Sequence, residues 1–294
     1  MFQIAILAVL VGGALTSQGA KWKYGKTDKV HEIYGPNDWG KVSKHCDESA
    51  QSPINIEKSS LKNDGSLRKL RFLPEDWYGR VYGVLENNGH APTLEIDKPR
   101  GTSTLTGGPL GNSVYKLQQM HIHFGCENNK GSEHTVNGRA FAGELHLVHY
   151  NIRYGDFKTA VDKPDGLAVI GVFIQEDDDD DSSYSLKVIS GAARYIRKAG
   201  SKKRIRAIYL NNLVPHLRDL SKSYFYKGSL TTPPCYQSVQ WIVLKRPIRA
   251  SEYVMRALRG LLNDDEQPMC DNFRPTLLRN GRSVSQCDDD RLFN

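Results

Sequence analysis

Three histidines of this chain lie at the spacing of β-strands. His121 and His123 are two residues apart, and His146 follows Glu144 by the same interval. Side chains on a strand alternate between its two faces, so His121 and His123 point to the same side, together with Gln119. If the two strands are neighbours, the three imidazoles converge on one point.

Three converging imidazoles predict a metal centre of the catalytic kind. Zn²⁺ prefers four ligands, and three protein nitrogens leave one position open for water or substrate. Gln119 and Glu144 can each accept the outer N–H of a ligand histidine, which fixes its tautomer. The alternative is a half-polar strand whose histidines face solvent, and the spacing alone leaves it open. No HExxH or CxxC pattern offers a second zinc site.

The elements that must position these histidines are mainly strands. Besides the two histidine segments, β-branched and aromatic residues gather at 80–85, 93–96, 114–118, 167–174 and 238–244, separated by turn residues. Helical periodicity is scarcer, and its best candidates are 185–197 and 250–262. The sequence therefore predicts a mainly β (α+β) protein, with a largely antiparallel sheet and peripheral helices.

The chain has 294 residues and begins with an uncharged, mostly apolar segment. Residues 1–20 are interpreted as a secretory signal peptide cleaved near Gly19 or Ala20. An uncleaved anchor is the alternative, but the apolar core from Ile4 to about Leu15 is shorter than the roughly 20 residues that span a bilayer. No repeat or long linker divides residues 21–294, so we expect one domain in a secreted, extracellular protein without a membrane span.

The net charge of +7 is unevenly distributed. A basic cluster comprises Lys198, Lys202, Lys203, Arg204 and Arg206. It lacks interleaved aromatic residues, so no nucleic-acid partner is expected. The acidic run Glu176–Asp181 is typical of a solvated loop, and in an exported protein it could also bind calcium or a mineral surface weakly. Five cysteines in an oxidising compartment predict disulfides with one thiol left over, which could be free or could link two chains.

The histidine segments and the sequence SLTTPP at 229–234 together carry a resemblance to the α-class carbonic anhydrases. The resemblance extends through QSPINI (51–56), NNGH (87–90), GELHLVHYN (143–151), YGDF (154–157), DGLAVIGVF (165–173) and DNFRP (271–275). It covers nearly the whole mature chain, and it includes the secreted members, among them shell- and matrix-associated proteins. It implies one domain built on a central, twisted, mostly antiparallel ten-stranded sheet, with zinc at the foot of a conical cleft.

The resemblance also implies an activity and its residues. The activity is reversible hydration of carbon dioxide to bicarbonate and a proton, by attack of zinc-bound hydroxide. His121, His123 and His146 would be the zinc ligands, and Gln119 and Glu144 the acceptors for their outer N–H groups. Thr231 would accept a hydrogen bond from the hydroxide and donate its own proton to Glu133. Thr232 would help to bind bicarbonate.

Two further groups of residues follow from the resemblance. His90 would carry the proton out of the cleft, with Tyr24 and Asn88 ordering water. The apolar wall for carbon dioxide would consist of Val148, Val169, Leu230, Val239 and Trp241. Two other histidines have no catalytic role in this interpretation: His134 is expected to satisfy a buried carboxylate, and His149 to be structural.

The chain departs from the family pattern at a few positions. Phe124 stands where many members carry tryptophan, and Thr93, preceded by Pro92, replaces a common asparagine of the polar cleft. Cys46 and Cys235 match the disulfide of extracellular members. Of the remaining cysteines, we expect Cys270 to pair with Cys287, which leaves Cys126 unpaired.

Two alternatives from other functional classes remain open. One is an inactive binding module related to carbonic anhydrase. Such modules lose a zinc histidine, whereas all three are present here. The other is an extracellular matrix or biomineralisation protein that interacts with calcium, for which the acidic run and the additional cysteines are the only indications.

Overall fold

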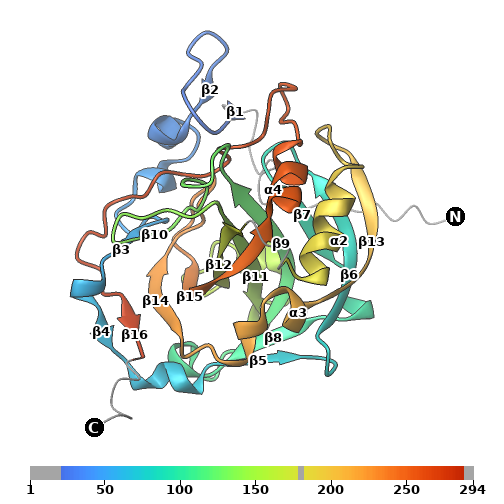
Figure 1. Ribbon diagram of the computed structural model, residues 1–294. Helices are drawn as coiled ribbons and strands as arrows, with labels where there is room; N and C mark the ends of the chain where they lie inside the picture. Colours follow the sequence, from blue (N-terminus) through green and yellow to red (C-terminus); the bar gives the residue numbers. More distant parts are fainter. Residues whose placement is uncertain (1–20, 178–181, 288–294) are drawn as a thin grey trace, which may run out of the picture.

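The computed structural model describes residues 21–177 and 182–287 (Figure 1). The predicted signal peptide and residues 178–181 of the acidic run lie outside the described residues. One large sheet dominates the described chain, and twelve strands belong to it. No helix among the described residues is long and apolar enough to cross a membrane.

Ten strands follow one another along the main path of this sheet. In spatial order they are β13 (Lys202–Tyr209), β6 (Arg80–Asn87), β7 (Pro92–Ile96), β9 (Tyr115–Phe124), β11 (Gly143–Asn151), β12 (Leu167–Asp177), β15 (Val239–Ser251), β14 (Ser223–Gly228), β16 (Ser285–Gln286) and β4 (Lys62–Asn63). Most neighbours are antiparallel, whereas β12 with β15 and β16 with β4 are parallel. The predicted ten-stranded, mostly antiparallel sheet is confirmed along this path.

Further short strands surround the path. β5 (Arg71–Pro74) pairs with β8 (Ser103–Thr106), which joins the large sheet through β9. Two small sheets consist of β1 (Lys21–Trp22) with β2 (Ile33–Tyr34), and of β3 (Asn55–Ile56) with β10 (Thr135–Val136). The 3₁₀ helices are η1 (Pro36–Lys41), η2 (Lys44–Asp47), η3 (Lys58–Ser60), η4 (Gly65–Lys69), η5 (Lys98–Arg100), η6 (Gly108–Leu110), η7 (Ile152–Tyr154) and η8 (Pro215–Arg218).

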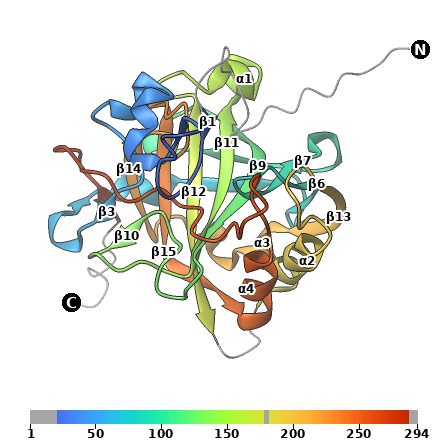
Figure 2. The same ribbon diagram turned by 90° about the horizontal axis from the view of Figure 1, so that it is seen from above.

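The α-helices are peripheral, as predicted. They are α1 (Phe157–Ala160), α2 (Tyr184–Ala193), α3 (Leu210–Leu213) and α4 (Glu252–Arg259). Figure 2 shows α2, α3 and α4 together at one side of the molecule. α2 begins where the Ser183 hydroxyl accepts the N–H of Leu186, which is an N-cap. α4 begins two residues later than predicted, because Ala250 and Ser251 still belong to β15 and pair with β12.

β13 forms one end of the main path, and in the described chain it pairs only with β6. Its side chains Lys202, Lys203, Arg204 and Arg206 are exposed, whereas Ile205 and Ile208 are buried. The basic cluster found in the sequence is therefore largely the outer face of an edge strand.

β9 holds an irregularity that fixes the direction of the histidines. Leu117 and Met120 both belong to the main apolar core, although residues three apart on a regular strand face opposite sides. Opposite them on β11, His149 pairs with Leu117 and Val148 with Gln119, so Gln118 is an extra residue. This is a β-bulge, and it sets the phase of the strand from Gln119 onward.

Two disulfides join distant parts of the chain. Cys46 is bonded to Cys235, as the resemblance implied, and Cys126 is bonded to Cys270. Cys287 is the free cysteine of the described residues, and it is buried. The predicted pairing of Cys270 with Cys287 is wrong. Cys287 directly follows β16, which is held between β14 and β4, whereas the Cα of Cys270 lies 5.0 Å from that of Cys126.

Candidate metal centre

The three predicted ligand histidines lie on two adjacent, antiparallel strands. His146 of β11 pairs with His121 of β9, and Glu144 pairs with His123. The alternation predicted from the sequence is confirmed: Ile122 and Leu145 point into the main core, on the side away from the imidazoles. One nitrogen from each of the three histidines lies within 4.8 Å of the other two. The structure therefore brings the three side chains together.

Each imidazole uses one ring N–H for a hydrogen bond to a fixed acceptor. The pairs are His121 Nδ1 with Oε1 of Gln119 (3.0 Å), His123 Nδ1 with the main-chain oxygen of Asn272 (2.7 Å), and His146 Nε2 with Oε1 of Glu144 (2.8 Å). Because these acceptors cannot donate, the N–H must be on the outer nitrogen of each ring. The inner nitrogens, two Nε2 and one Nδ1, are then lone-pair donors.

This donor set fits a divalent cation. Nδ1 of His146 lies 3.2 Å from Nε2 of His121, and two nitrogens without a proton repel each other at that distance. Nε2 of His123 is buried and has no hydrogen-bond partner. Unpaired buried polar atoms are costly, and a bound cation satisfies all three at once. The three residues could therefore hold a metal ion.

The protonation state of the ligands also favours a metal. Burial, reinforced by the two neighbouring imidazoles, holds the pKa of His121 well below its ordinary range. Burial likewise lowers the pKa of His123. Both rings are neutral near pH 7, which is the form that coordinates metals.

Glu144 orients the ligand of β11 and ties it to a second buried network. Its Oε2 accepts the main-chain N–H groups of Glu133 (3.0 Å) and His134 (2.8 Å). Its Oε1 also accepts from Nδ1 of His134 at 2.7 Å, which confirms the predicted role of that histidine. Burial by itself raises the pKa of Glu144, but His134 and His146 outweigh it and hold this pKa well below its usual value.

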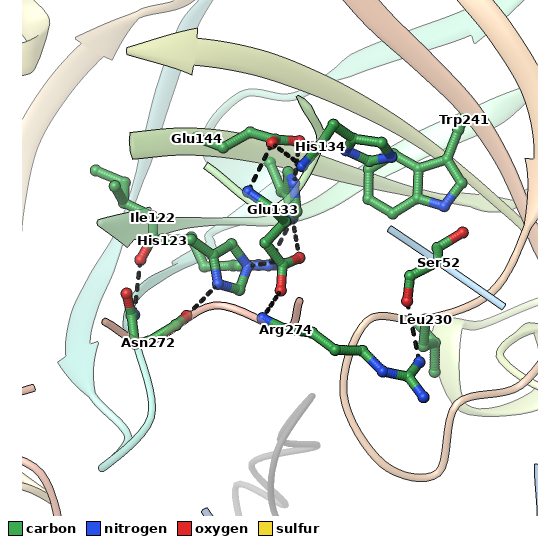
Figure 3. A network of polar contacts seen from close by, with 12 residues as sticks. Ser52, Ile122, His123, Glu133, His134, Glu144, Leu230, Trp241, Asn272 and Arg274 are labelled. Atoms are coloured by element: carbon green, nitrogen blue, oxygen red, sulfur yellow. Dashed lines mark hydrogen bonds and ion pairs between the residues drawn. The ribbon is translucent and has the colours of Figure 1, made fainter. Parts of the chain in front are cut away.

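Asn272 is a site residue that the sequence analysis missed. Its main-chain oxygen accepts from His123, its Oδ1 accepts the N–H of Phe124 at 2.7 Å, and its Nδ2 donates to the main-chain oxygen of His90 at 2.9 Å. Figure 3 shows Asn272 beside His123, with Glu133 on the other side of the ring. The only signal in the sequence was the DNFRP segment, which gave no role to a main-chain carbonyl.

Glu133 lies next to the ligand histidines, and residues 229–234 form the loop that carries Thr231 and Thr232, called here the threonine loop. Oε1 of Glu133 accepts the main-chain N–H of Arg274 at 2.9 Å, and Oε2 lies 3.5 Å from Nε2 of His123 without a hydrogen-bond partner. The predicted hydrogen bond from Thr231 to Glu133 is thus not formed among the described residues. Thr231 and Thr232 are nearly buried, and the Cys46–Cys235 disulfide anchors the end of their loop.

Comparison with known proteins decides the family. Residues 34–288 match the family described as eukaryotic-type carbonic anhydrase. The chain belongs to this family. It is also 39% identical over 269 residues to Carbonic anhydrase 7 of Mus musculus and to Carbonic anhydrase 7 of Homo sapiens. Each alignment covers 90% of this chain and 96% of the relative. The protein is therefore an enzyme, a carbonic anhydrase.

In this carbonic anhydrase, His90 lies within an aromatic group at the N-terminal segment. Trp22 stacks on its ring, with centroids 3.8 Å apart and planes 12° apart. Tyr24 is edge-on to His90 and to His123, each at 6.4 Å. Burial lowers the pKa of His90 and, together with the charge of Glu133, raises that of Tyr24 well above its ordinary value. Both side chains are therefore neutral at pH 7.

The two departures at Pro92 and Thr93 of this carbonic anhydrase have a structural account. Oδ1 of Asn88 accepts the main-chain N–H of His90 at 2.9 Å, and Nδ2 of Asn88 donates to Oγ1 of Thr93 at 3.1 Å. Thr93 therefore supports the loop that carries His90. Pro92 lies in β7 opposite Asn87, within the ladder between β6 and β7.

The residues predicted for the apolar wall form part of one buried cluster. Its members include Val148, Val169, Leu230, Val239 and Trp241, contributed by three neighbouring strands and the threonine loop. The Trp241 ring is 4.9 Å from that of His146, at an angle of 65°. An apolar surface therefore adjoins the metal centre on the side of β12 and β15.

Proposed function

We propose that this carbonic anhydrase hydrates carbon dioxide reversibly to bicarbonate and a proton, with Zn²⁺ held by His121, His123 and His146. The observation that carries this proposal is the set of three unprotonated inner nitrogens, each ring fixed by a hydrogen bond on its outer side. Three nitrogen ligands leave one position open on Zn²⁺. Family membership supports the same substrate.

The reaction needs a nucleophile, and the side chains of the cleft orient it. When held by the three histidines, Zn²⁺ would supply hydroxide near neutrality, because it lowers the pKa of bound water to about 7 in carbonic anhydrases. Thr231 would accept a hydrogen bond from this nucleophile. Its donation to Glu133 would have to form when the centre is loaded, because Oε2 of Glu133 has no hydrogen-bond partner in the structure. Thr232, on the same loop, binds the bicarbonate product. The wall around Trp241 receives carbon dioxide, which offers little for polar groups to bind.

His90 completes the cycle by accepting the proton, with Tyr24 and Asn88 ordering the intervening water. It can accept only when neutral, and its lowered pKa keeps it neutral to a lower pH than an exposed histidine. His90→Ala should therefore slow turnover in weak buffer by about a hundredfold, the lower end of the usual contribution of one positioned proton-transfer group. Stopped-flow hydration with and without added imidazole measures this effect, because imidazole should restore part of the rate.

The pH dependence of kcat checks that His90 is the group that accepts the proton. In the wild type, kcat in weak buffer should rise with an apparent pKa below about 6.5, the ordinary histidine value. Unchanged kcat in His90→Ala without imidazole would show that another group carries the proton.

We further propose that the protein acts outside the cell. Two disulfides support this setting, because disulfides persist in oxidising compartments. A calcium-binding role of the acidic run has less support. Glu176 pairs with Arg259 at 3.1 Å and Asp177 with Arg249 at 3.2 Å, so two of its carboxylates already have cationic partners. Nothing in the site favours an inactive binding module.

The test of the proposed function is stopped-flow carbon dioxide hydration on the purified chain, with zinc measured on the same sample. We expect about one zinc per chain and fast hydration that a chelator abolishes and added zinc restores. Stoichiometric zinc without hydration would contradict the proposed activity, and hydration without bound metal would contradict the assigned metal centre.

A further inference from the structure

The Cys126–Cys270 disulfide joins two segments that both reach the metal centre. Cys126 follows the end of β9 by two residues, and Cys270 precedes Asn272 by two residues. The bond joins segments 144 residues apart in the chain. It therefore ties the strand that carries His121 and His123 to the segment that supplies the acceptor for His123.

Hydrogen bonds continue this connection from the disulfide to the centre. The N–H of Asp271 donates to the main-chain oxygen of Phe124 at 2.9 Å, and Oδ1 of Asp271 accepts the N–H of Cys126 at 2.9 Å. The N–H of Phe124 donates to Oδ1 of Asn272. Phe124 and Cys126 are thus both hydrogen-bonded to residues of the segment 270–272, and Gly125 lies between them.

The acceptor itself comes from irregular backbone. Residues 270–275 form neither helix nor strand, and Asp271 has φ +65°, a conformation that L-residues other than glycine adopt unwillingly. Nevertheless, the main-chain oxygen of Asn272 must stay 2.7 Å from Nδ1 of His123, and its side chain must hold the main-chain oxygen of His90. Because residues 270–275 have no β-ladder hydrogen bonds, another constraint is needed to hold Asn272 in this position.

We propose that the Cys126–Cys270 disulfide is a positioning element of the metal centre. By fixing the segment 270–272 against the end of β9, it holds the Asn272 carbonyl under His123 and slows release of the metal. Cys126 and Cys270 do not touch the metal, so their effect passes through Asn272. The inference rests on the proposed zinc centre for its metal readout, and on the protein alone for its backbone readout.

The experiment compares the wild type with the double variant Cys126→Ser/Cys270→Ser. Zinc release from the loaded enzyme to excess dipicolinate should be about tenfold faster in the variant. This is the lower end of the loss in metal affinity when a group hydrogen-bonded to a metal ligand is removed. Hydrogen exchange of the metal-free proteins supplies the second readout. The amides of Phe124, Cys126 and Asp271 should exchange faster in the variant, while those of β12 and β15 should not.

Lys130→Ala is the matched control, because Lys130 follows Cys126 in the chain and contacts Asp271 of the segment 270–272. It removes the exposed ion pair between Lys130 and Asp271 (3.1 Å) without cutting the covalent link, and zinc release should stay within twofold of the wild type. If the double variant does not fold, brief phosphine reduction of the wild type replaces it. Each phosphine takes up one oxygen from water and converts one disulfide to two thiols. Cys126 is exposed, whereas Cys46 and Cys235 are buried, so mass spectrometry can identify protein reduced at the outer bond alone.

The outcomes separate the two proposals. A wild type that binds no zinc overturns the proposed function, while faster exchange confined to the three amides still supports the positioning role. A wild type that binds zinc, with equal release from the double variant, overturns the positioning role. Faster exchange spread over the whole sheet also overturns it, because the bond would then contribute only general stability.

Discussion

His121→Ala is expected to abolish stoichiometric zinc binding and to lower carbon dioxide hydration by at least about a thousandfold. The variant leaves two nitrogens where the centre has three, and a metal contributes several kcal/mol of charge stabilisation to the transition state. A loss of about 4 kcal/mol corresponds to roughly a thousandfold in rate. Zinc analysis after dialysis, together with stopped-flow hydration, measures both effects.

The fold of His121→Ala should survive. The His121 side chain lies on the side of β9 that faces the other ligand histidines and is only partly buried, whereas the core side of the strand is formed by Met120 and Ile122. His45→Ala is the control. Its side chain is 49% exposed and is hydrogen-bonded to Glu48, so this variant should keep zinc and activity. Full zinc occupancy and full activity in His121→Ala would refute the ligand assignment.

Glu144→Ala should lower the free energy of unfolding by about 3–5 kcal/mol, the range for breaking a buried charged network. Glu144 is fully buried and accepts hydrogen bonds from two main-chain N–H groups and two imidazoles. The alanine variant leaves these donors without partners in the protein interior. Urea unfolding at pH 7 measures the change. The control is Glu48→Gln, at an exposed carboxylate, which should change the free energy of unfolding by less than about 0.5 kcal/mol.

The pH dependence of the unfolding free energy tests whether the ionised carboxylate of Glu144 is what stabilises the fold. The pKa of Glu144 is lower in the folded protein than in the unfolded chain, so its contribution is present above the unfolded pKa of about 4.3 and is lost as the pH falls toward the folded pKa. The difference in unfolding free energy between the wild type and Glu144→Gln should therefore shrink below about pH 4.3. A difference that stays constant into the acid range would show that the ionised carboxylate is not the stabilising group.

Strand alternation predicted the core of the site, because His121, His123 and Gln119 follow one another on a regular stretch of β9. It failed just before that stretch. Gln118 looks in the sequence like another member of the alternating pattern, whereas in the fold it is the extra residue of a bulge. Only the partner strand reveals this, since a bulge is a difference in register between two strands.

Long-range partners were beyond the same reasoning. The acceptor for His123 is a main-chain oxygen 149 residues away, and every residue carries such an oxygen. The cysteine pairing failed similarly: Cys270 and Cys287 are near in sequence, but their segments run to different parts of the fold. Local pattern predicts which way a side chain points, while tertiary structure decides what it meets.

The charged outer face of β13 bears on how copies of this protein behave in solution. A strand at the end of a sheet offers unpaired N–H and C=O groups that can recruit a strand from another molecule. Here Lys202, Lys203, Arg204 and Arg206 are exposed along that strand, with Lys202 paired to Glu86 at 3.0 Å and Arg204 to Asp97 at 3.8 Å. Because charged side chains, lysine above all, disfavour strand addition at a sheet edge, we expect this strand to resist edge-to-edge pairing between copies.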